Sequence, residues 1–80
     1  MPVESIHFIA MLRERSILRE WVDRAVKEPD RVENCPDGTQ HFLRKISENE
    51  GRWLRVVVNV SGNPTKFVTV FFDRRLRREK

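Results

Sequence analysis

The apolar positions of the chain change their spacing about a third of the way along it. Over residues 18–27, apolar side chains recur every three or four residues and charged side chains fill the opposite side. This spacing predicts a helix packed on one face. A shorter apolar pattern predicts a preceding helix through about Glu14, with Ser5 and Ser16 as the caps of the two helices. Pro29 ends the second helix because proline disfavours helical geometry in the residue before it.

Beyond Pro29 the pattern becomes that of strands, in which successive side chains point to opposite faces. A short edge strand is predicted at 31–34, followed by longer strands at 39–46, 52–60 and 66–72. The last strand is apolar on both faces, which predicts that it is central or otherwise covered on both sides. Turn residues separate the strands, so neighbouring strands pair antiparallel.

Helices followed by strands are typical of an α+β domain. We expect two N-terminal helices packed on one face of a three- to four-stranded antiparallel sheet, in a single domain over residues 1–73. A chain of 80 residues buries only about 60% of its unfolded surface and has room for one core. The residues predicted to form that core are Ile6, Phe8, Ile9 and Leu12 in the first helix, Leu18, Trp21, Val22, Ala25 and Val26 in the second, and Leu54, Val56, Val58 and Val60 in the sheet.

The net charge of +4 is concentrated at the C-terminus. Residues 74–80 hold five basic groups and one acid, whereas residues 1–73 hold eleven of each sign. A basic tail of this kind binds phosphate through counterion release, or it is a solvated end that keeps the protein soluble. Charge alone leaves both alternatives open.

Cysteine content and hydropathy restrict the class of protein. Cys35 is the single cysteine, so no internal disulfide forms, and it has no partner at zinc-ligand spacing. No residue is placed to activate it as a nucleophile. The apolar stretch 8–12 is far shorter than the ~20 residues needed to span a bilayer, and Glu4 precedes it. We therefore expect a cytoplasmic protein without a metal, a cofactor or membrane contact.

Three stretches of the chain form a distinctive set: residues 7–17, the strand sequence over 54–58 and the last strand around 68–70. Through them, nearly the whole chain resembles the bacterial family known as domain of unknown function 4258. The chain departs from the family pattern at Ser16, where glycine is usual, and at Met11, where a second arginine is common. The landmarks that it keeps are His7, Arg15, Pro29, Arg55 and Thr69.

The order of two helices and a curved sheet is also similar to that of the BrnT toxins, in the wider RelE and ParE superfamily. This second resemblance is one of pattern, and fold alone does not determine function. It implies a metal-independent ribonuclease that acts through basic and polar side chains of the sheet and the C-terminal segment. Such a toxin would be paired with an antitoxin protein.

Cleavage of RNA without metal requires a general base, a general acid and cations at the phosphate. His41 in the first long strand and His7 at the start of the first helix are the acid–base candidates. Arg55 is the candidate for stabilising the transition state, because it stands in a strongly apolar strand on the side away from the core. The candidate RNA-binding residues are Arg15, Arg44, Lys45, Arg74 and Arg75.

Each candidate also has a structural interpretation. Arg55 can cover apolar surface with its stem and pair with an acid such as Asp73. Trp53 either stacks a base or packs under a loop, and an isolated histidine is often a surface or structural residue. The alternative to a toxin is therefore a non-catalytic module. Such a module would bind nucleic acid, or its open sheet edge would accept an antitoxin or a second copy of the chain.

Overall fold

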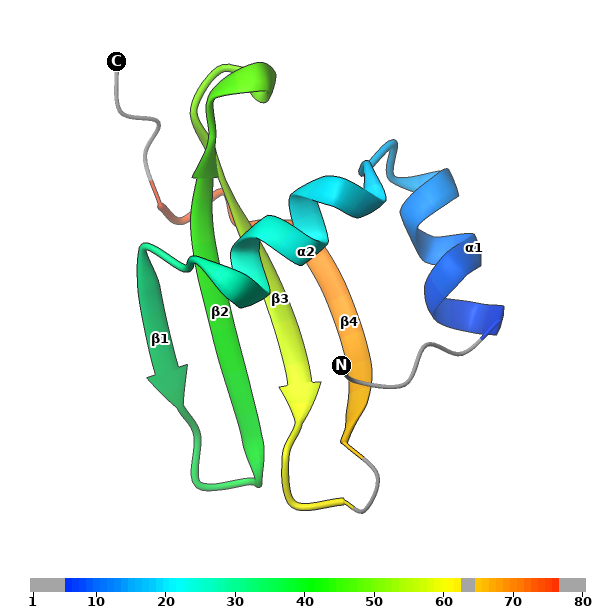
Figure 1. The fold of residues 1–80 in the computed structure, drawn as a ribbon, viewed down its shortest axis with the longest axis vertical. Coiled ribbons are helices and arrows are strands. Elements are labelled where there is room, and N and C mark those ends of the chain that lie inside the picture. The colour runs from blue at the N-terminus through cyan, green and yellow to red at the C-terminus, as the bar shows by residue number, and fades with distance from the viewer. Residues whose placement is uncertain (1–5, 63–64, 77–80) are drawn as a thin grey trace.

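The computed structural model describes residues 6–62 and 65–76 and shows an α+β fold (Figure 1). Four antiparallel strands form one sheet in the order β1-β2-β3-β4. Neither described helix is long and apolar enough to cross a membrane. The elements are α1 (Ile6–Glu14), α2 (Arg19–Lys27), β1 (Arg31–Asn34), β2 (Thr39–Ile46), a 3-10 turn η1 (Ser47–Asn49), β3 (Arg52–Asn59) and β4 (Lys66–Phe72).

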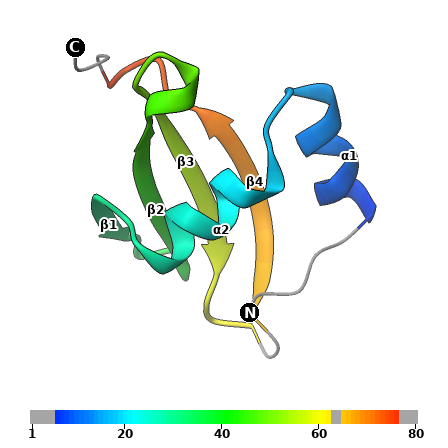
Figure 2. The same ribbon diagram turned by 45° about the horizontal axis from the view of Figure 1, so that its top comes forward.

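Helix α2 lies across one face of the sheet, where it packs on β2 and β3 (Figure 2). Its residues Trp21, Val22 and Ala25 are buried there, as predicted. Opposite them Leu54, Val56 and Val58 form the core-facing side of β3. Val26 is only partly buried, and Val60 lies beyond the end of β3 and is exposed.

The sequence predicts more core residues in the two helices than the structure buries. In α1, Phe8 and Leu12 enter the core, and the Phe8 ring stacks on Phe67 of β4 with ring centroids 4.5 Å apart. Ile6 and Ile9 are exposed, because α1 covers only the β4 side of the sheet and turns one narrow face inward. Leu18 is exposed as well, since it precedes the first turn of α2.

The prediction that Ser16 caps α2 is wrong. Helix α2 begins at Arg19, and Leu18 at its N-cap makes no capping bond with its side chain. Ser16 instead ends α1 with a φ of 55°. Its N–H donates to the carbonyl of Arg13, and the N–H of Ile17 donates to that of Leu12, which together form a Schellman motif. The cap predicted at Ser5 lies outside the described residues.

Strand β4 is an edge strand, so the first of its two predicted positions, central in the sheet, is wrong. A register shift at Val57 and Val58 of β3 also interrupts the alternation of the side chains along β4. Phe67 and Val70 face the core, whereas Val68 is exposed. Helix α1 lies beside β4, and Arg15 at its end donates a hydrogen bond of 2.6 Å to the carbonyl of Val70.

Candidate functional site

Arg55 lies on the face of the sheet that the helices leave open, because it alternates with the core residues of β3. Its side chain is only 7% exposed. Its Nε donates to Asp73 Oδ2 at 2.7 Å, and its Nη1 donates to Glu33 Oε1 at 2.9 Å. The same Nη1 lies 2.8 Å from His41 Nδ1. We call Glu33, His41, Arg55, Asp73 and Arg75 the Arg55 network.

The two ring nitrogens of His41 have different partners. Arginine only donates hydrogen bonds, so Nδ1 of His41 acts as the acceptor from Arg55 and the ring hydrogen is on Nε2. Nε2 lies 3.4 Å from Thr39 Oγ1, and that hydroxyl donates to Asp37 at 2.5 Å. His41 therefore links the buried arginine to a turn at the start of β2.

The carboxylates of the network are held in their ionised form. Hydrogen bonds, first from Arg75 and then from Arg55, hold the pKa of Asp73 far below its usual range. The hydrogen bond from Arg55 likewise lowers the pKa of Glu33. Two arginines thus meet two carboxylates, and the charge of the network is balanced. This arrangement is the ion pair that the sequence suggested for Arg55 and Asp73, and a catalytic role for Arg55 stays a prediction.

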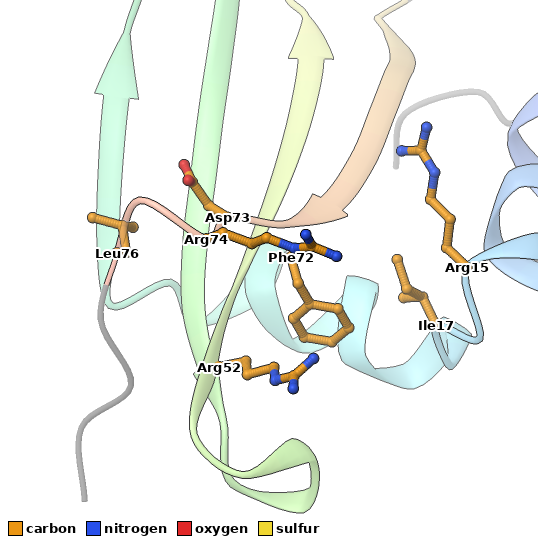
Figure 3. A pocket seen from close by; sticks show the side chains of 7 residues that line it. All are labelled: Arg15, Ile17, Arg52, Phe72, Asp73, Arg74 and Leu76. Carbon is orange, nitrogen blue, oxygen red and sulfur yellow. The ribbon is translucent and has the colours of Figure 1, made fainter.

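A pocket of about 590 Å³ opens at one end of the sheet. It lies between the α1–α2 connection, the start of β3 and the segment that follows β4 (Figure 3). Leu54 pairs with Phe72, and the N–H of Asp73 donates to the carbonyl of Trp53. Arg52 at the start of β3 and Arg74 after the end of β4 therefore lie at the same end of the sheet. The residues that line the pocket are Arg15, Ile17, Arg52, Phe72, Asp73, Arg74 and Leu76.

The pocket carries an excess of positive charge. Arg15, Arg52 and Arg74 are all exposed there. Asp73 is the single carboxylate among the described lining residues, and it is already paired with Arg55 and Arg75. Arg52 has only a long contact of 3.6 Å with Glu50, and the described residues supply no acid to Arg74. We call Arg15, Arg52 and Arg74 the pocket arginines.

The model of one protein family matches residues 5–72, and its description is domain of unknown function (DUF4258). The chain belongs to this family. No curated protein and no solved structure matches it.

Positions on which the family resemblance rested come together in the structure. Thr69 Oγ1 donates to Met11 Sδ at 3.2 Å, and Arg15 Nη1 lies 3.4 Å from Thr69 Oγ1. The positive φ of Ser16 explains why glycine suits this position in the DUF4258 family, since glycine adopts that conformation without steric cost. Two of the landmarks, Arg15 and Thr69, thus hold the α1–α2 connection against the edge of β4.

The structure separates the two histidine candidates. His7 is exposed on α1, which lies beside β4. His41 is in β2, two strands away across the sheet. His41 and Arg55 do come together, but within the charge-balanced network described above.

The predicted RNA-binding residues fall into two groups. Arg15 and Arg74 line the pocket. The others have partners elsewhere: Arg44 donates to the backbone carbonyl of Glu28, Lys45 lies over the ring of Trp53, and Arg75 pairs with Asp73. Trp53 is buried between Lys45 and Arg31, so the structure supports its packing role.

Arg52 is the pocket residue that sequence reasoning missed. Its signal was its position at the start of β3: because β3 and β4 pair antiparallel, Arg52 lies at the same end of the sheet as the residues that follow Phe72. The boundary predicted at 73/74 between the domain and a basic tail divides the residues that line the pocket. Arg75 and Leu76 belong to the domain surface, because Asp73 binds the first and the pocket includes the second. Residues 77–80 lie outside the described residues.

Proposed function

We propose that this domain binds single-stranded RNA through the pocket arginines. The observation that carries the proposal is the gathering of three exposed arginines around Phe72, among which the structure describes a single ion pair, the long 3.6 Å contact of Arg52 with Glu50. Exposed arginines bind phosphate by charge and by hydrogen bonds, and release counterions from the nucleic acid. The other basic residues of the segment 74–80 add positive charge to the chain next to Arg74.

Single-stranded RNA fits the pocket better than a duplex does. Proteins bind single strands by combining a positive groove with aromatic side chains that contact unstacked bases. The pocket supplies both, because Phe72 stands in its wall beside Arg52 and Arg74. A duplex keeps its bases stacked and would leave the apolar part of the pocket unused.

The proposal is for binding without cleavage. General acid–base catalysis needs a titratable group at the reacting atoms. No histidine is among the described residues that line the pocket, and the carboxylate of Asp73 is engaged by two arginines. The toxin hypothesis, in which His41 and Arg55 cleave RNA, predicts shortened RNA, so the binding test also has to examine the length of the RNA.

The test measures the affinity for a fluorescent single-stranded RNA of about 15 nucleotides at several salt concentrations. Arg52→Ala combined with Arg74→Ala should weaken binding about 10- to 100-fold and reduce the salt slope by about 1.4, since each phosphate contact contributes about 0.7. The control combines Lys27→Ala with Lys66→Ala. These lysines are exposed, lie outside the pocket and carry the same total charge.

Three outcomes would contradict the proposal. A wild-type protein that does not bind RNA would disprove it directly. Equal weakening by the arginine and lysine pairs would show that net charge acts without the pocket. Shortened RNA after incubation would show that the protein cleaves RNA rather than only binding it. If an Arg55→Ala protein that remains folded no longer cleaves RNA, the toxin hypothesis would be supported.

A further inference from the structure

We infer that the pocket holds one unpaired nucleotide, with its base against Phe72 and its phosphate between Arg52 and Arg74. This inference rests on the proposed function and names the part of the RNA that enters the pocket. Three features of the pocket support it: the placement of the two arginines about the ring, the apolar wall, and the fixed position of the segment after β4.

The ends of two paired strands determine where the two arginines lie. Arg52 is the first residue of β3, and Arg74 lies two residues after the end of β4, so both extend from the same end of the antiparallel pair. In Figure 3 their side chains reach out on either side of Phe72. A phosphate bound by both guanidinium groups would bring an attached nucleoside within reach of the ring.

The remaining wall is apolar. Ile17, from the α1–α2 connection, and Leu76, after β4, line the pocket together with Phe72. Phe72 is half-buried, with its ring edge-on to Trp21 at a centroid distance of 6.0 Å. A phosphate alone makes no favourable contact with such an apolar wall, whereas stacking of a base on an aromatic ring stabilises the bound state.

Asp73 holds the segment that carries Arg74 and Leu76. The carboxylate of Asp73 accepts from the backbone N–H of Arg75 at 2.9 Å, and its carbonyl accepts from the N–H of Leu76. The backbone N–H of Asp73 donates to the carbonyl of Trp53 and so extends the hydrogen bonding between β3 and β4 by one residue. On the other side of the pocket, the bond from Arg15 to the carbonyl of Val70 fixes a third cation. The pocket is therefore formed before any ligand binds.

The size of the pocket agrees with a single nucleotide. Sites for small ligands enclose about 300–1,000 Å³, and this one has about 590 Å³. The volume exceeds what a lone phosphate needs. The structure thus assigns one nucleotide to the pocket, and the rest of a bound strand would lie on the surface outside it.

The experiment uses three competitors against the labelled RNA: adenosine 5′-monophosphate, ribose 5-phosphate and inorganic phosphate. We expect the nucleotide to displace RNA at about one tenth of the concentration that ribose 5-phosphate requires, because stacking is lost without the base. Phe72→Leu keeps an apolar side chain and should remove this difference. Val68→Leu, an exposed position on the same strand, is the control and should preserve it.

A second measurement protects the test against a variant that fails to fold. Titration of the wild-type protein with adenosine 5′-monophosphate, followed by amide chemical shifts, should move the signals of Phe72, Arg74 and Leu76 at lower concentration than inorganic phosphate does. Equal competition by all three compounds while RNA still binds would overturn the nucleotide pocket and leave the proposed function intact. Nucleotide binding without RNA binding would overturn the proposed function alone.

Discussion

Arg52 and Arg55 stand three residues apart on β3 and have opposite surroundings. Arg55 is buried on the open face of the sheet and meets two carboxylates and a histidine. Arg52 is exposed at the strand end, where it lines a pocket together with another exposed arginine, Arg74. Close ion pairs balance the charge of Arg55, whereas Arg52 has a single long contact of 3.6 Å with the exposed Glu50. The contrast indicates that Arg55 serves stability and that the pocket arginines serve a ligand.

This comparison assigns different consequences to the loss of each arginine. A buried ion pair contributes little over a well-packed apolar pair, but breaking it leaves an uncompensated charge in the interior. Exposed cations without partners contribute almost nothing to stability. The predictions below therefore rank the arginines by their effect on unfolding, from the largest effect to the smallest.

The largest effect is expected for Arg55→Ala. It removes the buried one of the two arginines that pair with Asp73, a residue that is only 4% exposed, and it also removes the arginine that pairs with Glu33. We expect the free energy of unfolding to fall by about 3–5 kcal/mol, measured by urea denaturation followed by circular dichroism. Arg52→Ala, on the same strand, should change it by no more than about 0.5 kcal/mol. Equal and small losses for both variants would remove the distinction between the two arginines.

An intermediate effect is expected at acid pH. The pKa of Asp73 lies far below its usual value of 3.8, chiefly because of hydrogen bonds from Arg75 and then Arg55. A lowered pKa in the folded state stabilises the fold at every pH above the unfolded value, and this contribution disappears as the pH falls toward the folded value. The free energy of unfolding should therefore be steady from pH 7 to about pH 5 and fall below about pH 4.

Asp73→Asn isolates the part of the acid dependence that belongs to this carboxyl. It should lower the free energy of unfolding by about 2 kcal/mol at neutral pH, because the hydrogen bonds from the charged arginines weaken. It should also make the fall of that free energy at acid pH less steep. Asp23→Asn replaces a carboxyl on α2 for which the structure describes no ion pair, and should keep the slope of the wild type. An unchanged slope in Asp73→Asn would show that another group governs acid unfolding.

Much of the fold was predictable because local periodicity determines it. The predicted bounds of β1, β2 and β4 agree with the structure, and β3 ends only one residue earlier than expected. The role of Ser16 was not predictable from residue type, since serine is typical of helix N-caps and nothing in the pattern shows a positive φ. The apolar pattern of β4 also left its position in the sheet ambiguous. A strand with this pattern can be central, with a strand on each side, or it can be an edge strand beside which a helix lies.

The site was less accessible to sequence reasoning than the fold was. Strand alternation was enough to place Arg55 opposite the core and to suggest Asp73 as its partner. The pocket depends instead on the segment that follows β4 and on the turn that Asp73 stabilises there. A tail boundary drawn at residue 74 separated Arg74 from Arg52, although both line the pocket.

The smallest effect is expected where like charges meet. Arg52 at the start of β3 and Arg74 after the end of β4 both line the pocket, and like charges held near one another destabilise a fold by about a few tenths of a kcal/mol. In a double-mutant cycle, the combined alanine variant should be about 0.2–0.5 kcal/mol less stable than the sum of the single variants predicts, because either single variant already removes the repulsion. Urea denaturation at low salt measures this coupling, and high salt should remove it by screening. Coupling of the opposite sign would mean that the two arginines share a neutralising partner. The pocket would then be a second balanced network like that of Arg55, and its excess charge would no longer point to a ligand.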